Sequence, residues 1–310
     1  MKYTVLASRA PGTVEGYQRA FNRWKTFANG TLQLTQVLPV SPIHFALYLQ
    51  YLLEQTSSPS SISTAFYAIN WAHKSAGFLS PTEHPTVTLI KDGAIRLCSR
   101  KKNKKEPLEP DHLKALAIST NTNDLLQLRN LVMFVLSFSG FLRSSEVLEL
   151  RRSDIEFHTE HMSVYIHKSK TDQLREGNSV VIAQTGGYLC PVTLLQLYFS
   201  QAEINENSTE YIFKPITSSK DRKKLISTDK HISYSTYRES FKRSFKGIVP
   251  DITKYSTQSS RSGGATMAAN AGVKERNFQR HGRWRTTEAK DIYVKDSIAS
   301  KLHVSKSLGL

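Results

Sequence analysis

The sequence predicts a mainly α-helical protein with one small antiparallel β-sheet. Apolar residues recur at spacings of three and four through the first hundred residues, which is the period of a helix face. Two short segments, 163–166 and 179–182, are rich in β-branched residues and flank a polar stretch, so they predict a β-hairpin. Helical patterns return from Val192 onward. We therefore expect an all-helical N-terminal domain followed by a larger mixed α+β domain.

The composition is that of a globular protein, because 39% of the 310 residues are hydrophobic. The longest apolar stretch, Leu131–Leu136, is too short to span a bilayer, and the first residues lack the apolar core of a secretory signal. We expect a soluble intracellular protein, in the nucleus of a eukaryote or in the cytoplasm and nucleoid of a bacterium. Cys98 and Cys190 are expected to be buried free thiols, with a single disulfide as the alternative.

The chain is strongly basic. It contains 42 Lys and Arg against 26 Asp and Glu, a net charge of +16. Such an excess favours a polyanionic partner, because bound cations release the counterions that are condensed on phosphates. An anionic membrane is the rival partner, but the sequence contains no strongly basic amphipathic helix with a bulky apolar face. Nucleic acid is therefore the expected partner, and no membrane contact is expected.

Four helices are predicted in the first domain. One apolar face is formed by Val14, Tyr17, Phe21, Trp24 and Ala28. Ser41 followed by Pro42 is a typical helix start. The face of that second helix is formed by Phe45, Leu49, Leu52 and Leu53. After a break over 57–61, a third face is formed by Ile62, Phe66, Ile69 and His73. The fourth helix is expected from Pro85 to Cys98.

A basic run marks the boundary between the domains. It contains Arg100, Lys101, Lys102, Lys104 and Lys105. Prolines follow it, so we expect a helical domain over 1–99, a linker over 100–107 and a second domain over 108–310. The linker is interpreted as a DNA-backbone contact, with a solvated charge run or a nuclear-import signal as alternatives. Within the second domain we expect a buried helix over 125–136 that ends near Gly140, and a short helix opening at Ser144.

Several familiar site types are absent from the sequence. It contains no glycine-rich nucleotide-binding loop and no HExxH motif, and His158 and His161 have no third ligand in register. No metal and no other cofactor is expected. Phosphoryl transfer without a metal requires fixed cations, a nucleophile and a proton donor for the leaving oxygen. Arginine suits the first role, since its planar guanidinium stays charged and bonds two oxygens.

The residues that fit this chemistry occur in a definite order. Gly140-Phe141-Leu142-Arg143 precedes a helix start, and Glu146 lies three residues on. Lys170 stands in the hairpin loop, Arg261 opens a helix of small residues that we expect to end near Gly272, and His281-Gly282-Arg283-Trp284 is followed nine residues later by Tyr293. Over roughly 108–310 these motifs resemble the tyrosine recombinase and integrase family. The segments Ser169–Gln173 and Gly282–Trp284 are similar in style to recombinases of eukaryotic mobile elements.

The resemblance implies a role for each matching residue. Arg143 and Arg261 match the two catalytic arginines, Glu146 the acidic residue that supports the first of them, and Lys170 the hairpin lysine, for which Lys168 is the rival. Trp284 falls where members have His or Trp, and Tyr293 matches the nucleophile. The family pattern is HisxxArg, however, and this chain has Gln258 in place of that histidine. Glutamine donates a hydrogen bond but cannot shuttle a proton. His281 is a supporting candidate at a spacing that does not match.

The resemblance also implies a mechanism and an assembly. Tyr293 would attack a DNA phosphodiester to form a 3′-phosphotyrosyl link, and Lys170 would protonate the 5′-hydroxyl leaving group. The enzyme would act as a homotetramer on two double-stranded DNA duplexes, and as a monomer or weaker oligomer without DNA. The helical domain would correspond to the family's core-binding domain, and Ile298 and Leu302 would anchor the C-terminal segment on a neighbour. The alternatives are a DNA-binding protein that has lost catalysis, favoured by Gln258, and a type IB topoisomerase.

Overall fold

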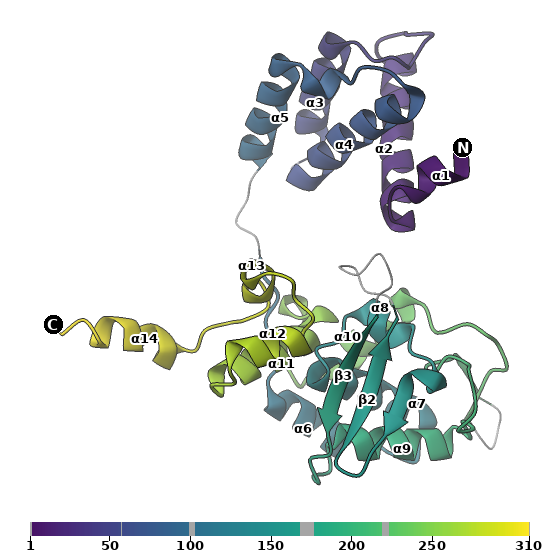
Figure 1. Ribbon diagram of the computed structural model, residues 1–310, viewed down its shortest axis with the longest axis vertical. Coiled ribbons are helices and arrows are strands. Elements are labelled where there is room, and N and C mark those ends of the chain that lie inside the picture. The colour runs from purple at the N-terminus through teal and green to yellow at the C-terminus, as the bar shows by residue number, and fades with distance from the viewer. Residues whose placement is uncertain (1, 57, 99–102, 168–176, 219–222, 310) are drawn as a thin grey trace. The chain divides into compact units, whose positions relative to one another are not determined.

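The computed structural model describes residues 2–56, 58–98, 103–167, 177–218 and 223–309. Within it the chain divides into two compact units, Met1–Asn103 and Lys104–Leu310. Helices dominate both units, and the strands form small antiparallel sheets in the second (Figure 1). The predicted fold class is therefore confirmed. No helix in the described ranges is both long enough and apolar enough to cross a bilayer.

The first unit is entirely helical in its described residues (Figure 1). Its elements are α1 (Lys2–Ala7), α2 (Pro11–Gly30), α3 (Pro42–Gln55), α4 (Pro59–Ala76), η1 (Pro81–Glu83) and α5 (Pro85–Cys98). The predicted start of α3 is correct, since the Ser41 hydroxyl accepts a hydrogen bond from the backbone N–H of His44 at 3.2 Å. The core is built on aromatic side chains, including the fully buried Trp24 and Phe45.

Two details of the first unit differ from the expectation. The predicted break over 57–61 is too long, because Pro59 occupies the first turn of α4, where a missing backbone N–H costs nothing. Helix α1 was not expected, since it spans only six residues and carries no capping signal. The free thiols are confirmed for both units: Cys98 and Cys190 are buried and unpaired with each other.

The second unit surrounds a long buried helix. Its helices are α6 (Pro110–Ser119), α7 (Leu125–Ser139), α8 (Ser144–Leu148), η2 (Arg152–Asp154), α9 (Pro191–Gln201), α10 (Tyr234–Phe245), η3 (Ile252–Lys254), α11 (Gln258–Asn270), α12 (Glu275–His281), α13 (Thr287–Asp291) and α14 (Ile298–Lys306). Helix α7 is buried along most of its length and ends at Gly140, as predicted. It packs against α9, α10 and α11, so it fixes the segments that follow it.

A three-stranded sheet lies beside α7 and α9 (Figure 1). Its strands are β1 (Ile155–Phe157), β2 (His161–Ile166) and β3 (Asn178–Ala183), in the order β1-β2-β3 and antiparallel throughout. Val164 pairs with Val180, and Met162 with Ile182, so one face of the sheet is buried in the core. The two predicted strands are confirmed. Most of the predicted hairpin loop, including Lys170, lies outside the described residues.

Four elements of the second unit were not predicted. Strand β1 is three residues long, and α6 begins at Pro110, shortly after the predicted linker over 100–107. The hairpin of β4 (Ile216–Ser218) and β5 (Lys223–Leu225) interrupts a region expected to be helical. Strands β1, β4 and β5 are each too short to show a clear periodicity, and α6 spans only ten residues.

Candidate active site

The carboxylate of Glu146 is the centre of the site. Its Oε1 accepts a hydrogen bond from Nη1 of Arg143 at 2.7 Å, and its Oε2 accepts one from the backbone N–H of Arg143 at 2.8 Å. Nη2 of Arg283 donates to the same Oε2 at 2.7 Å, and Nη1 of Arg261 lies 3.6 Å from it. One buried carboxylate therefore holds three guanidinium groups together.

The chain brings these residues together through the packing of α7, α8 and α11. Arg143 stands immediately before α8, so Glu146 in the first turn of α8 reaches back to it. Arg261 lies in α11, which packs against α7. That approach depends on Gly264, where an added Cβ would lie 2.0 Å from the carbonyl oxygen of Phe138.

Arg261 is the most enclosed of the three arginines, with 1% of its surface exposed. Its Nη2 donates to the Gly282 carbonyl at 2.7 Å, and its Nη1 donates to the Phe141 carbonyl. The guanidinium carbon lies 4.9 Å from the ring centres of both Trp284 and Tyr293. Burial and the charge of Arg143 lower the pKa of Arg261, whereas Glu146 opposes that shift.

Arg283 is a site residue that the sequence analysis did not single out. Its side chain is 3% exposed, and besides Glu146 it donates to the carbonyls of Gly140, Phe141 and His281. Its backbone has φ 56, a left-handed conformation that non-glycine residues rarely adopt. Phe141, with φ 47, is also left-handed, so both motif segments carry backbone strain of the kind found at functional sites. Nothing local in the sequence signals this role.

Tyr293 and Trp284 pack against each other and against the guanidinium of Arg261. Their ring centres are 5.5 Å apart, and Tyr293 is half-buried against a small cluster formed by Phe141, Ala265, Phe278 and Trp284. The indole Nε1 of Trp284 is buried and has no hydrogen-bond partner among the described residues. A buried donor without a partner is costly, so a movement of the ring that exposes Nε1 would let Trp284 bond an incoming acceptor.

A cleft of about 480 Å³ opens beside Tyr293. Gln258, the first residue of α11, lines it together with Tyr293, and so do Lys104 and Lys105 from the predicted linker. In the described chain, the lining contains Lys104, Lys105, Lys295 and Lys301 against the carboxylates of Glu106 and Asp296. Lys295 is paired with Glu106. The excess of lysine makes the cleft suited to an anion.

The remaining predicted residues fall into two groups. His281 does not face Tyr293 in any recorded contact: its Nε2 donates to the Ser139 carbonyl at 2.7 Å, and its ring packs edge-on against Phe141. Burial lowers the pKa of His281, and the nearby Arg283 and Arg261 lower it further.

The other predicted residues lie outside the described residues: Lys170, Lys168, Arg100, Lys101 and Lys102. In the described ranges, no three His, Cys, Asp or Glu side chains are grouped to hold a metal ion.

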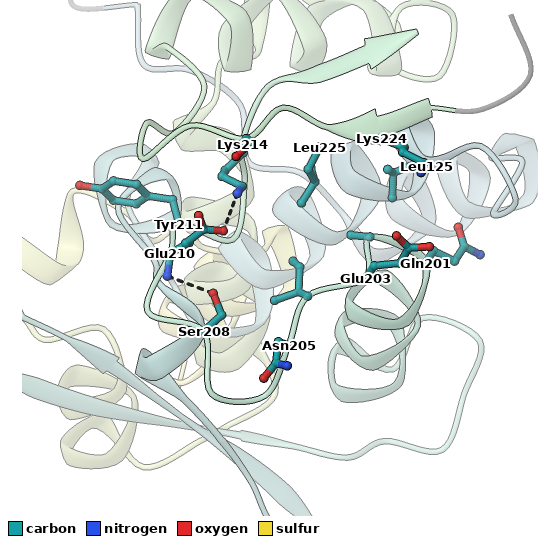
Figure 2. A pocket seen from close by; sticks show the side chains of 13 residues that line it. Leu125, Gln201, Glu203, Asn205, Ser208, Glu210, Tyr211, Lys214, Lys224 and Leu225 are labelled. Atoms are coloured by element: carbon teal, nitrogen blue, oxygen red, sulfur yellow. Dashed lines mark hydrogen bonds and ion pairs between the residues drawn. The ribbon is translucent and has the colours of Figure 1, made fainter. Parts of the chain in front are cut away.

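A separate cavity of about 280 Å³ lies between the end of α9 and the β4–β5 hairpin (Figure 2). Lys214 Nζ is paired with Glu210 Oε2 at 2.6 Å, and the Glu210 backbone N–H donates to the Ser208 hydroxyl at 3.2 Å; Figure 2 marks both interactions with dashed lines. This cavity shares no lining residue with the cleft beside Tyr293. Its main charges are satisfied within the protein.

Residues 106–299 match the family model described as the phage integrase family. The chain belongs to this family of tyrosine recombinases, whose activity is site-specific recombination. It is 25% identical over 300 residues to an integrase/recombinase XerD homolog of Selenomonas ruminantium, and the match covers 93% of this chain and 82% of that protein.

Solved structures share the fold at low sequence identity. The XerH site-specific recombinase bound to a palindromic difH substrate has a TM-score of 0.66 and 12% identity, over 95% of this chain and 79% of that one. The Tn1549 transposon integrase in complex with transposon right end DNA has a TM-score of 0.63 and 13% identity, over 97% and 95%. These likenesses support the fold of the chain.

Proposed function

We propose that this protein cleaves and rejoins DNA strands, with Tyr293 as the nucleophile. The phenolic oxygen of Tyr293 releases its proton to solvent and attacks the scissile phosphorus, a 3′-phosphotyrosyl bond forms, and the bond from phosphorus to the 5′ oxygen breaks. The leaving oxygen takes a proton from Lys170, whose role rests on the family resemblance. A 5′-hydroxyl from a second duplex then attacks the phosphotyrosine and restores the free tyrosine, so the bond energy is retained.

One observation carries this proposal: a half-buried tyrosine lies directly against a guanidinium that is part of a three-arginine cluster. Charge develops on the non-bridging oxygens during phosphoryl transfer, and fixed cations stabilise it. Arg143 is the arginine best placed to meet a phosphate, because its side chain is 12% exposed, whereas those of Arg261 and Arg283 are almost fully covered. Trp284 supplies an unused N–H donor beside them.

Arg261 takes part only if the rings over it move. In this conformation Tyr293 and Trp284 cover its guanidinium, and both of its terminal nitrogens are bonded to carbonyls. We therefore propose that DNA binding displaces Tyr293 from Arg261, which exposes the nucleophile and the cation together. Double-stranded DNA is the proposed partner, held by the helical unit and the catalytic unit, with four protomers on two duplexes.

The C-terminal helix fits such an assembly. No residue of α14 is buried, and Ile298 and Leu302 are 70% and 49% exposed. Exposed apolar side chains on a helix favour contact with another surface. We propose that α14 docks on a neighbouring protomer through these two residues.

A second candidate function is DNA binding by a recombinase fold with weak or absent catalysis. Gln258 favours it, because this residue lines the cleft beside Tyr293 where the family pattern has a histidine. The amide can donate to a phosphate oxygen, but it cannot carry a proton. A topoisomerase-like activity is a third candidate, distinguished by relaxation of supercoiled DNA that lacks a recombination site.

The experiment is a covalent-trapping assay. The full chain is incubated with nicked duplex DNA from its own flanking sequence, and adducts are separated on a denaturing gel. Wild type should form an adduct, Tyr293→Phe should form none, and Tyr255→Phe, a tyrosine outside the cleft, should match wild type. A wild-type chain that binds the duplex but forms no adduct would identify the second candidate as correct. An adduct that persists in Tyr293→Phe would overturn the nucleophile assignment.

A further inference from the structure

A second cleft, of about 510 Å³, lies in the helical unit among α1, α2 and α4. Three of its lining residues are aromatic: Tyr17, Tyr67 and Trp71. Tyr67 is 52% exposed, and the rings of Tyr17 and Trp71 have centres 5.9 Å apart at an angle of 48°. Aromatic faces that remain accessible in a cleft are suited to stacking with a flat ligand.

Two polar atoms at this cleft are buried without a partner. Nε1 of Trp71 is a donor and Oδ1 of Asn70 is an acceptor, and neither has a hydrogen bond within the described chain. Each such atom costs about 1–3 kcal/mol when it is left unsatisfied. Both atoms are covered, so a ligand edge that carries an acceptor and a donor reaches them only when these side chains turn toward the cleft; a nucleobase edge carries both groups.

The charge of the cleft selects an anion. Arg9 and Lys74 line it, and the lining contains no Asp or Glu. Both side chains are exposed, and neither is recorded in an ion pair with a described residue. The cavity in Figure 2 differs in this respect, because Glu210 there neutralises Lys214. Aromatic walls, a donor and acceptor pair and unpaired cations together match an anionic aromatic ligand.

We propose that this cleft binds an unstacked nucleotide of a DNA strand. The base stacks on Tyr67, its edge bonds to Asn70 and Trp71, and its phosphate lies at Arg9 and Lys74. The inference rests on the proposed function, because strand exchange leaves bases transiently unpaired. The inference adds a separate binding site for one unpaired base, because the bases of a continuous duplex are stacked and cannot enter this cleft. Stacking makes the site tolerant of sequence.

The test measures binding of a fluorescent twelve-residue oligothymidylate to the full chain by anisotropy, at about 150 mM salt to limit long-range attraction. Tyr67→Ala should weaken binding about tenfold, because base stacking on an aromatic ring is lost. Tyr67→Phe keeps the ring and should bind within about twofold of wild type. Lys74→Ala should weaken binding more than Arg96→Ala, which removes a charge from the exposed surface of α5, outside the cleft.

An abasic strand of the same length separates stacking from charge. It keeps its phosphates, so Tyr67→Ala should not weaken its binding, whereas Lys74→Ala still should. Far-UV circular dichroism checks that each variant is folded, and the charge reversal Lys74→Glu gives a second variant at an exposed position. The inference is overturned if Tyr67→Ala leaves oligothymidylate binding unchanged, or weakens the abasic strand or a matched duplex equally.

The covalent-trapping assay keeps this inference separate from the proposed function. Loss of the adduct with intact oligothymidylate binding counts against Tyr293 chemistry alone. A normal adduct with no effect of the Tyr67 and Lys74 substitutions counts against the cleft alone.

Discussion

Arg283 and Glu146 form a buried ion pair between segments that are far apart in the sequence, with 2.7 Å between Nη2 and Oε2. Glu146 is 3% exposed, so solvent screens the pair little. The same carboxylate also serves Arg143 and Arg261. Three guanidinium groups therefore share one carboxylate. Removing the carboxylate should destabilise the protein more than removing one of the guanidinium groups.

Removing the anion should be severe. Glu146→Gln leaves the guanidinium groups of Arg143, Arg261 and Arg283 without their shared counter-charge in a buried site, so we expect a loss of about 3–5 kcal/mol in the free energy of unfolding. Urea denaturation followed by circular dichroism measures it. Glu149→Gln is the matched control, because Glu149 is exposed at the end of α8, and it should change stability by less than about 0.5 kcal/mol. Equal effects of the two changes would contradict this account.

The same carboxylate gives the fold a pH dependence. Burial alone would raise the pKa of Glu146, but the charges of Arg283, Arg261 and Arg143 outweigh it and hold that pKa below 4.5. Its contribution to stability is therefore fully present above pH 4.5 and is lost as the pH falls through the folded-state pKa. The urea midpoint of Glu146→Gln should fall less than that of wild type below pH 4.5, and Glu149→Gln should follow wild type.

Removing one cation should cost less than removing the anion. Arg283→Met leaves Glu146 with Arg143 and Arg261 and reduces the repulsion among the guanidinium groups, but it also removes the donor to three carbonyls, so we expect a loss of about 2–3 kcal/mol. Burial is also the first cause that lowers the pKa of Arg283, which shows that its charged form is costly here. Urea denaturation gives the comparison with Glu146→Gln. Arg280→Met, on the exposed surface of α12, is the control; a loss for Arg283→Met as large as for Glu146→Gln would be inconsistent with this ranking.

The indole N–H of Trp284 should matter for cleavage more than for stability. Trp284→Phe keeps an aromatic ring in the cluster and removes a buried donor that has no described partner, so stability should change little. If that donor meets the phosphate, the single-turnover rate of adduct formation should fall about a hundredfold. Phe278→Leu perturbs the same cluster without touching a donor and should keep the rate within about threefold. Equal losses of rate in both variants would point to packing instead.

Gln258→His should raise the rate of adduct formation. A histidine at the start of α11 would line the cleft beside Tyr293 and can carry a proton, so we expect a gain of at least about tenfold. The gain should depend on pH around the ordinary histidine pKa of about 6.5. Gln196→His, on the exposed face of α9, should leave the rate unchanged. A flat response to Gln258→His would mean that this side chain does not reach the reacting groups.

Gly264→Ala tests the close packing that positions Arg261. The added Cβ would meet the Phe138 carbonyl at 2.0 Å and the Phe141 ring at 2.7 Å, and the carbonyl cannot move without shifting the end of α7. We expect a loss of about 1–3 kcal/mol together with reduced cleavage. Thermal melts measure the change in stability. Gly187→Ala is the control and should be close to neutral, because nothing lies within 4 Å of its new Cβ. A neutral Gly264→Ala would show that α11 can shift freely.

Much of the fold follows from periodicity alone. The spacing of apolar residues predicts the buried faces of α2, α3 and α4 and the end of α7. It also predicts strands β2 and β3, which pair with each other. Short elements are the exceptions. Strand β1 spans only Ile155–Phe157 and depends on its neighbour β2 for its hydrogen bonds, so its own sequence carries little signal.

Local sequence patterns predict only part of the site. The family resemblance predicted that Arg143, Glu146, Arg261, Trp284 and Tyr293 belong to one site, and the fold brings them together. Their catalytic roles stay predictions. Arg283 could not be found in this way, because its role depends on a left-handed backbone and on a carboxylate more than a hundred residues earlier. A contact between residues so far apart in the chain cannot be predicted from the periodicity of a single sequence.

Arg261 has a consequence for how the enzyme fails. Its guanidinium donates to the carbonyls of Phe141 and Gly282, so the 140–143 and 281–284 segments are held together by one buried side chain that we also propose to be catalytic. A molecule that begins to unfold through either segment loses this fastening and its cation cluster at the same time. Loosening of either segment would therefore also displace the cation that we propose acts beside Tyr293.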